Sequence, residues 1–391
     1  MKKQTIAIDT PFVRPDAYGS LSVPLYTNVS FEFDDASLMA DVFTGRVKAP
    51  DYARVENPTV TNLEHRVRKL TGATNVTAFN SGMAAISNTL FAVAGKGKTI
   101  VTSRHLFGNT LSLITGTLKR FGVGSRLCDL TNLEEVDAVV DDDSCCIYLE
   151  IVTNPQLEVA DLKGLAQIAH RKGIPLIADS TIIPFTETSL KDLGVDIEVL
   201  SSTKYLSGGG TSLGGLVLDY GTFPEINERI KSDLLFNLGA YMNPYSAYQQ
   251  TLGLETLDVR YKRQASNALT VAEGLRNIRG IKRVNYVGLK DNPFYELARR
   301  QFGATSGAMV TIDLESKEAC FKFINSLKLV HRATNLFDNR TLAIHPASTI
   351  FGNFTEQQLR DMDVHDTTIR LSVGLETPED ILADIRQALE Q

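Results

Sequence analysis

A lysine near the middle of the chain has the surroundings of a covalent catalyst. Lys204 follows the apolar run of residues 195–200 and a hydroxyl-rich triplet, and a glycine-rich stretch, residues 208–215, comes after it. A lysine at the end of a buried strand is held rigidly and partly desolvated, which favours its uncharged, nucleophilic form. The pattern is that of a lysine that forms a Schiff base, although a solvated loop lysine would also satisfy it.

A carboxylate ends the preceding apolar run. Residues 174–179 read Ile-Pro-Leu-Ile-Ala-Asp, and Asp179 lies 25 residues before Lys204, a gap that suits one crossover to a neighbouring strand. Pyridoxal phosphate needs a carboxylate at its ring nitrogen, because the ion pair keeps the ring protonated and able to accept electrons. Asp179 is a candidate for this role; the alternative is that it caps the following turn.

A candidate phosphate site lies upstream, where a helical pattern begins. The sequence Asn-Ser-Gly-Met-Ala-Ala-Ile places Ser81, Gly82 and Met83 in the expected first turn. Glycine lets the backbone approach an anion, and the N-terminus of a helix offers free N–H groups. The hydroxyls of Ser201 and Thr203 could contribute to the same site. The alternative is that Ser81 is an ordinary N-cap.

These residues are embedded in a pattern of alternating strands and helices. Residues 161–171 carry apolar side chains at helical spacing, and short apolar runs typical of buried strands lie at residues 99–103, 145–150, 174–179, 195–201 and 215–219. The alternation predicts a mostly parallel sheet with helices on both faces, and ligand sites in such sheets lie at the carboxyl ends of the strands. Asp179 and Lys204 lie at those ends.

Three regions are expected. Residues 1–55 contain four prolines that interrupt any long element, and we interpret them as an extended arm. Residues 56–253 form the large domain. Residues 254–391 form a smaller α/β domain, with helices expected near 260–275 and 378–389 and strands near 307–313 and 368–372.

Composition excludes several function classes. The 391 residues carry a net charge of −6 without a basic stripe, which argues against a nucleic-acid partner. No run approaches the length of a membrane span, and Met1–Thr10 lacks an apolar signal core. Four cysteines form no disulfide framework or C-x-x-C motif, so a reducing cytoplasm is expected. The histidines match no metal-ligand spacing, and no metal is expected.

Seven short motifs occur in one order along nearly the whole chain, from about residue 10 to residue 389. Together they resemble the Cys/Met metabolism family of pyridoxal-phosphate (PLP) enzymes, whose members include cystathionine synthases and lyases, methionine γ-lyase and the homoserine-ester sulfhydrylases. The motifs are residues 52–59, 81–83, 106–110, 154–155, 179–181, 201–204 and 369–374. The resemblance implies the PLP-dependent transferase fold type I, an α/β fold with a mostly parallel seven-stranded sheet in the large domain and a smaller C-terminal α/β domain.

The resemblance also implies roles for the cofactor-side residues. Lys204 would bind the cofactor and move the substrate α-proton, and Asp179 would pair with the ring nitrogen. Gly82 and Met83 of the motif that begins at Ser81 would bind the phosphate through backbone N–H groups, and Ser201 and Thr203 would bind it through hydroxyls.

Further roles follow from the same resemblance. Tyr52 and Arg54 would reach the phosphate of a neighbouring subunit, which implies a homo-oligomer: a dimer with shared active sites, commonly paired into a tetramer. On the substrate side, Arg370 would bind the α-carboxylate. Asn154 would contact the ring hydroxyl or the substrate, and Thr341 stands at a substrate-side position where the family usually has serine.

One departure from the family pattern bears on the reaction. Phe107 stands where most members have a tyrosine stacked on the cofactor ring. Phenylalanine can stack but cannot donate a proton. A carboxylate leaving group, with a pKa of about 4, needs less acid assistance than a thiolate does. Phe107 thus favours replacement on an activated homoserine ester; alternatively, it only packs, and Tyr52 or another group supplies the proton. Departures at Val152, Ser180, Gly209 and Thr341 leave the substrate pocket less defined.

The sequence therefore predicts a PLP-dependent transferase, most similar to O-acetylhomoserine sulfhydrylases, that makes homocysteine or methionine from the ester and sulfide or a thiol. The alternative is a methionine or cystathionine γ-lyase, which releases 2-oxobutyrate and ammonia. A non-catalytic scaffold is disfavoured because Lys204, Asp179 and Arg370 are all present. A dinucleotide-dependent dehydrogenase is disfavoured because no G-x-G-x-x-G follows the first strand.

Overall fold

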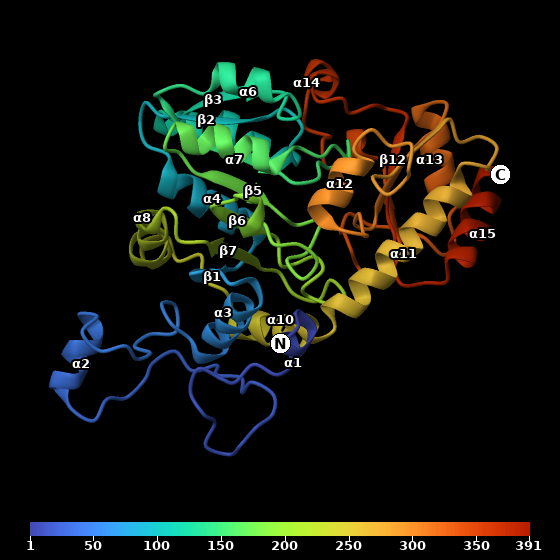
Figure 1. The fold of residues 1–391 in the computed structure, drawn as a ribbon. Coiled ribbons are helices and arrows are strands. Elements are labelled where there is room, and N and C mark those ends of the chain that lie inside the picture. Colours follow the sequence, from blue (N-terminus) through green and yellow to red (C-terminus); the bar gives the residue numbers. More distant parts are fainter.

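Two sheets organise the chain in the computed structural model, which describes residues 1–391 (Figure 1). The larger sheet has seven strands, and its seventh strand in chain order lies between the first and the sixth. All neighbouring strands run parallel except β7, which is antiparallel to both β1 and β6. The strand order is β1 (Asn75–Phe79), β7 (Gly215–Asp219), β6 (Ile197–Leu200), β5 (Leu176–Asp179), β4 (Ser144–Glu150), β2 (Thr99–Ser103) and β3 (Gly124–Cys128). The expected mostly parallel seven-stranded sheet is confirmed.

The central strands are buried on both faces, and their alternating side chains enter two separate cores. In β5, Leu176 and Ala178 belong to the core that contains helix α7 (Leu162–Arg171), whereas Ile177 belongs to the core that contains helix α4 (Gly82–Val93). This is the period-two geometry of a strand covered by helices on both sides. It explains why these strands are continuous apolar runs in the sequence.

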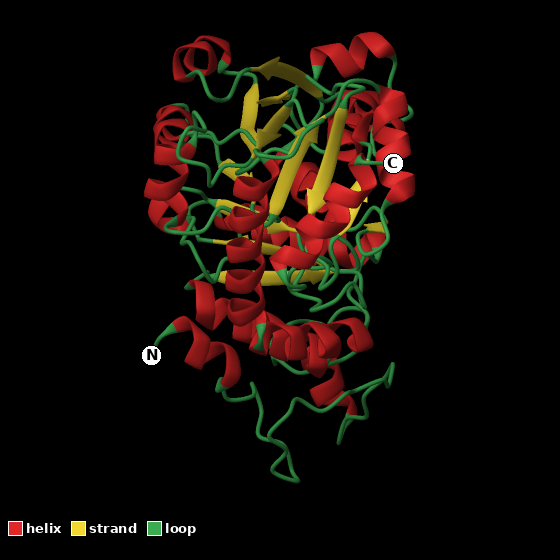
Figure 2. Ribbon diagram, turned by 90° about the vertical axis from the view of Figure 1, so that its right-hand side faces the viewer, coloured by secondary structure: helices red, strands yellow, loops and turns green.

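The smaller sheet lies in the C-terminal part of the chain. Its order is β10 (His331–Arg332), β11 (Leu342–Ile344), β12 (Thr368–Ser372), β9 (Met309–Asp313) and β8 (Arg283–Asn285). The long helix α11 (Leu257–Leu275) leads into it and packs against the final helix α15 (Pro378–Leu389) (Figures 1 and 2). The expected second α/β unit is present, while the exact divisions near residues 55 and 254 stay predictions.

The first 55 residues differ in part from the expected arm. Helix α1 (Lys3–Ile8) packs against α3 (Pro58–Thr71) and α10 (Pro244–Glu255), and its Ala7 is fully buried in the larger core. The Nζ of Lys3 donates to the carbonyl of Phe185 at 2.6 Å. Most of the rest of this region is exposed and extends away from both sheets, with α2 (Ala36–Phe43) at its far end (Figure 1).

Several element boundaries match the sequence expectations. Strands 99–103, 215–219 and 368–372 and helix 378–389 are confirmed with those bounds, and Gly72, at φ +69°, ends α3 as expected. Strands β1 and β3 were not predicted, because β1 is short with polar residues and β3 is only half-buried at the sheet edge. No helix combines the length and apolar character needed to cross a membrane. The remaining helices are α5 (Gly108–Ser112), α6 (Leu133–Val139), α8 (Pro224–Arg229), α9 (Phe236–Leu238), α12 (Tyr295–Phe302), α13 (Lys317–Ser326) and α14 (Glu356–Asp361).

Candidate active site

A cavity of about 320 Å³ lies at the carboxyl ends of β4, β5 and β6. Because these strands are parallel, their ends meet at one edge of the sheet, and residues from the C-terminal unit complete the wall. The cavity brings together ten of the thirteen predicted site residues. Its lining consists of Ser81, Gly82, Met83, Ile86, Phe107, Thr110, Glu150, Val152, Asn154, Asp179, Thr181, Ile182, Ser201, Thr203, Lys204, Leu213, Thr334, Leu336, Ile350 and Arg370.

Lys204 presents its amine to this cavity. Its Nζ donates to the side-chain oxygen of Asn335 at 2.9 Å, an uncharged acceptor that does not hold the amine in its protonated form. Burial, with a smaller contribution from the positive charge of Arg370, lowers the pKa of Lys204 to about 8. About a tenth of the amine is therefore uncharged at pH 7, far more than for an ordinary lysine, and this form is the one that a nucleophile or base requires.

Asp179 ends β5 on the floor of the cavity and is only 8% exposed. Its Oδ1 accepts from the N–H of Thr181 at 2.8 Å, so the turn-capping alternative is correct, and the carboxyl faces the cavity as well. Burial raises the pKa of Asp179 to about 6, against the opposing hydrogen bonds from Thr181. A buried carboxyl without a cationic partner would be stabilised in its charged form by a protonated ring nitrogen.

The N-terminus of α4 forms another part of the floor. The Oγ of Ser81 accepts from the N–H of Ala84 at 3.1 Å, so Ser81 is a true N-cap. The N–H groups of Gly82 and Met83 lie in the first turn, where the helix supplies no acceptor. A Cβ on Gly82 would lie 2.6 Å from the Cβ of Ser201, so only glycine fits this close approach.

The two hydroxyls predicted to assist at this point are not equivalent. The Oγ1 of Thr203 donates to the carbonyl of Gly214 at 3.1 Å and accepts from the N–H of Gly214 at 3.0 Å. A threonine hydroxyl has a single proton, so Thr203 has none left to donate to a phosphate in this arrangement. Ser201 uses its backbone groups: its N–H donates to Thr181 Oγ1 at 2.9 Å, and its carbonyl accepts from the N–H of Lys204 at 3.2 Å. Its hydroxyl remains available.

Arg370 brings a buried positive charge from β12 to the cavity wall. It is 2% exposed, and its guanidinium donates to Asn154 Oδ1 at 3.2 Å and to the carbonyls of Thr334 and Asn335 at 3.1 and 3.4 Å. Its Nε has no partner, and none of its acceptors is a carboxylate. Burial lowers the pKa of Arg370. A buried guanidinium without a counter-ion is suited to an incoming carboxylate.

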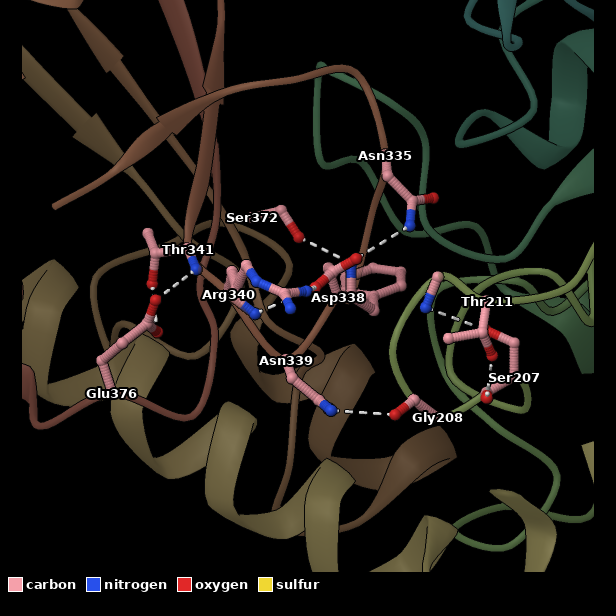
Figure 3. A network of polar contacts seen from close by, with 12 residues as sticks. Ser207, Gly208, Thr211, Asn335, Asp338, Asn339, Arg340, Thr341, Ser372 and Glu376 are labelled. Atoms are coloured by element: carbon pink, nitrogen blue, oxygen red, sulfur yellow. Dashed lines mark hydrogen bonds and ion pairs between the residues drawn. The ribbon is translucent and has the colours of Figure 1, made fainter. Parts of the chain in front are cut away.

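Thr341 does not line the cavity, contrary to the sequence expectation. Its side chain is fully buried and points to Glu376, to which its N–H and hydroxyl donate at 2.7 and 2.8 Å (Figure 3). The hydroxyl also accepts from the N–H of Gly374 at 2.9 Å. Thr341 therefore ties the start of β11 to the segment after β12, and its substrate-binding assignment is corrected.

Tyr52 and Arg54 also lie outside the cavity of their own chain. The guanidinium of Arg54 lies 5.5 Å from the ring centre of Tyr52 and 5.4 Å from that of Phe236, and it donates to the carbonyl of Phe236. Their predicted reach into a neighbouring subunit stays a prediction.

The structure adds residues that the sequence did not single out. Glu150 ends β4 as Asp179 ends β5, so the strand-end rule could have identified it. Asn335 had no such signal, because it lies in an irregular segment 131 residues from Lys204. That segment is tied to the glycine-rich loop after Lys204: Asn339 donates to the carbonyl of Gly208 at 2.8 Å, and Asn335 donates to Asp338 (Figure 3).

Glycine is required where this loop passes the segment. Gly210 has φ +67°, and a Cβ there would lie 2.5 Å from Asp338 Oδ2 and 2.8 Å from Asn335 Nδ2. The glycine-rich stretch after Lys204 thus permits close contact with the C-terminal unit.

A buried lysine, a strand-end carboxyl and a helix N-terminus, gathered at one edge of such a sheet, define a PLP-dependent enzyme of fold type I. The particular family follows from comparison with known proteins. Residues 4–390 match the family described as Cys/Met metabolism PLP-dependent enzyme, and the chain belongs to that family.

Relatives with two activities are similar to this chain. An L-methionine gamma-lyase of Fusobacterium nucleatum subsp. nucleatum is 38% identical over 378 residues, covering 96% of this chain and 94% of that protein. An O-acetyl-L-homoserine sulfhydrylase of Corynebacterium glutamicum is 33% identical over 398 residues, covering 93% and 91%. The chain is therefore an enzyme that depends on PLP, as a transferase or a carbon–sulfur lyase of sulfur amino-acid metabolism.

Solved structures agree with this fold. A crystal structure described as an O-acetylhomoserine (thiol)-lyase of Campylobacter jejuni subsp. jejuni matches with a TM-score of 0.97 and 30% identity, covering 100% of both chains. That structure contains N'-pyridoxyl-lysine-5'-monophosphate. A cystathionine gamma-lyase of Lactobacillus plantarum complexed with L-serine matches with a TM-score of 0.92 and 29% identity, covering 100% of this chain and 99% of that one.

Proposed function

We propose that this enzyme catalyses γ-replacement on an activated homoserine ester, with O-acetylhomoserine as the ester and sulfide or a thiol as the nucleophile. The product is homocysteine or methionine. The observation that carries the proposal is Phe107, which lines the cavity at the position of the expected stacking ring and has no hydroxyl to protonate a leaving group.

The residues of the cavity fit PLP. Lys204 would hold the cofactor, Asp179 would pair with its ring nitrogen, and the Phe107 ring would stack on it. The phosphate would lie at the first turn of α4, where the missing Cβ of Gly82 leaves room for Ser201, whose hydroxyl is free. When bound, the cofactor supplies an electron sink that stabilises negative charge at the α-carbon of the amino acid.

The chain's own residues then orient the substrate and move protons. Arg370 binds the α-carboxylate, and Asn154, whose side-chain oxygen it already holds, orients that group or the ring hydroxyl. Lys204 would take the α-proton, and its lowered pKa allows this near neutral pH. After a β-proton is also lost, acetate departs with the γ C–O bonding electrons. The nucleophile then forms the new γ C–S bond, and protons return to the β- and α-carbons to give the product.

Charge in the cavity favours the acetyl ester. Lys204 and Arg370 are the two cationic residues of the lining, and Arg370 is assigned to the α-carboxylate. A succinyl or phosphoryl ester would bring a further anion without a further lining cation to pair with it. An acetate leaving group has a pKa near that of a carboxylic acid, about 4, so departure needs little acid assistance.

The second candidate is elimination from methionine or cystathionine. The similarity to the gamma-lyase of F. nucleatum favours it. Departure of a thiolate gains from an acid, and in the absence of a hydroxyl on Phe107 another group, such as Tyr52 of a neighbouring subunit, would have to supply the proton.

The test is to incubate the PLP-loaded protein with O-acetylhomoserine, with and without sulfide, and to quantify homocysteine and 2-oxobutyrate. Sulfide-dependent homocysteine is expected. Abundant 2-oxobutyrate regardless of sulfide would instead establish the lyase. Absence of both products, with no reaction of methionine or cystathionine either, would refute both candidates.

We also propose a homo-oligomer that shares active sites and works in the cytoplasm. Tyr52, which is exposed, and Arg54, which is half-buried, lie outside their own cavity, and their positions support the shared site. The four free cysteines, three of them buried, support a reducing compartment. Sedimentation of the loaded protein tests the first point, because a monomer with full activity would refute it.

A further inference from the structure

A second buried carboxyl lies on the cavity floor beside Asp179. Glu150 is the last residue of β4, it is directly paired with Asp179 across the sheet, and it is 8% exposed. The mechanism above gives it no task. A carboxyl is rarely buried without a partner, so its hydrogen bonds indicate what it does.

The Glu150 carboxyl accepts hydrogen bonds from the backbone of the stacking residue and, next to it, from the backbone of Asn154. The N–H of Phe107 donates to Oε1 of Glu150 at 2.6 Å. Phe107 is the N-cap of α5, and its carbonyl already accepts from the N–H of Thr110 at 2.8 Å. The carboxyl of Glu150 thus satisfies an N–H group that no backbone carbonyl reaches, and it fixes the residue from which the aromatic ring projects.

Packing alone holds this ring only partly. Leu106 is fully buried, whereas Phe107 is half-buried and faces the cavity. The loop has a second attachment at His105, whose ring contacts Glu158 at 2.6 Å and Asp363 at 3.1 Å. The His105 contacts attach the loop to Glu158 and Asp363, whereas the contact with Glu150 sets the position of the Phe107 backbone at the cavity.

We propose that Glu150 is a positioning residue: it holds the Phe107 backbone and thereby sets the height and tilt of the Phe107 ring over the cofactor. The inference rests on the proposed stacking of Phe107, but not on which substrate the enzyme uses. Burial, and next the charge of Asp179, raise the pKa of Glu150 well above its usual range, which supports a neutral carboxyl acting as a hydrogen-bond acceptor.

Two substitutions separate the acceptor from the charge. In Glu150→Gln the amide oxygen still accepts from Phe107, whereas in Glu150→Leu no acceptor remains. Glu64→Leu is the matched control, because Glu64 also has a burial-raised pKa and accepts a backbone N–H, that of Ala78 at 2.8 Å, outside the cavity. Each variant is prepared with PLP, and the visible circular dichroism of the bound cofactor, its Kd and the melting temperature are measured.

The expected results do not require turnover. Glu150→Gln keeps the circular dichroism band and holds Kd within about twofold. Glu150→Leu changes the band and raises Kd roughly tenfold or more, the size of effect seen when a supporting hydrogen bond is lost behind a binding group. Glu64→Leu lowers the melting temperature about as much as Glu150→Leu does, but it leaves the circular dichroism band and the Kd of PLP unchanged.

A double-mutant comparison decides whether the effect passes through Phe107. In a Phe107→Ala background, adding Glu150→Leu is expected to change neither the band nor Kd further. A further change would mean that Glu150 contacts the cofactor directly and would overturn the proposal. It would also be overturned if Glu150→Leu behaved like Glu64→Leu, or if Glu150→Gln were as impaired as Glu150→Leu. Failure of the sulfide assay would leave these outcomes unaffected.

Discussion

The floor and the wall of the cavity carry opposite charges and come from different parts of the chain. The floor, formed by strand ends of the large sheet, presents the carboxyl of Asp179 as its negative charge, beside the carboxyl of Glu150, whose strongly raised pKa favours the neutral form. The wall, formed by β12 and the segment before β11, presents the guanidinium of Arg370, which donates to amide and carbonyl oxygens. Within the chain, neither the carboxyl of the floor nor the guanidinium of the wall has an oppositely charged partner.

This difference shows how such a site can orient an amino acid. A floor on which the Asp179 carboxylate has no cationic partner favours a cationic ring nitrogen, and a wall with an unpaired guanidinium favours a carboxylate. Lys204 lies between them and feels both burial and the charge of Arg370. With the roles proposed above, we expect the substrate to place its carboxylate toward the C-terminal unit and its reacting carbon toward Lys204.

Removing Lys204 should have the largest effect on activity, because the floor and the wall of the cavity both position groups around its amine. Lys204→Ala is expected to lower kcat by roughly 10³-fold or more, measured as homocysteine formed from O-acetylhomoserine and sulfide. Lys191→Ala, at an exposed lysine that donates to the Gly72 carbonyl at 3.4 Å, is the control. Activity within tenfold of the native enzyme would assign the chemistry to another residue.

Removing the charge of the wall should separate substrate from cofactor. Arg370→Leu is expected to raise KM for the amino acid roughly 100-fold, about 3 kcal/mol, because the buried bidentate contact is lost. The Kd of PLP should stay within about threefold, since the floor is untouched. The distinction between floor and wall fails if cofactor and substrate affinity fall together. Arg370→Lys, which keeps charge but not the planar fork, should recover only part of the loss.

The charge of the floor should appear in the pH dependence of stability. The pKa of Asp179 is raised from 3.8 to about 6 in the folded chain, so the folded state holds this proton more tightly. Between pH 4 and 6 the unfolded state ionises first, and the free energy of unfolding falls as pH rises. Cofactor-free Asp179→Asn avoids this loss, on the order of 1–3 kcal/mol above pH 6.

Thermal unfolding at several pH values checks this sign. The gain in melting temperature of Asp179→Asn over the native chain should grow from pH 4.5 to pH 7.5. With PLP present the order should reverse, because asparagine cannot pair with the ring nitrogen. A gain that is independent of pH would show that ionisation of Asp179 is not its cause.

Adding a hydroxyl at the stacking position should give the smallest effect. Phe107→Tyr is expected to raise 2-oxobutyrate release from methionine about tenfold, since the new hydroxyl can protonate a departing thiolate. Sulfide-dependent homocysteine formation from O-acetylhomoserine should change by less than threefold, because acetate needs no acid. Phe107→Leu, which lacks both ring and hydroxyl, controls for packing. Equal responses of both reactions would remove the link between Phe107 and the leaving group.

Much of the floor could be predicted from local sequence. Asp179 ends, and Lys204 closely follows, an apolar run typical of a buried strand, and parallel strands bring their carboxyl ends to one edge. Gly82 lies at a helix start, where free N–H groups are a property of the helix itself. The order of motifs added Phe107 and Arg370, which no local rule would have placed in the same cavity.

The tertiary structure decided what each group is paired with. Thr341 binds Glu376 and does not face the cavity. Thr203 donates its proton to the carbonyl of Gly214, and Asn335 accepts a hydrogen bond from the amine of Lys204. The first helix, expected within an arm, docks Ala7 in the core. A sequence fixes which groups a chain carries and the local geometry of strands and helices, whereas hydrogen-bond partners, burial and the resulting pKa values depend on contacts between distant residues, which exist only after folding.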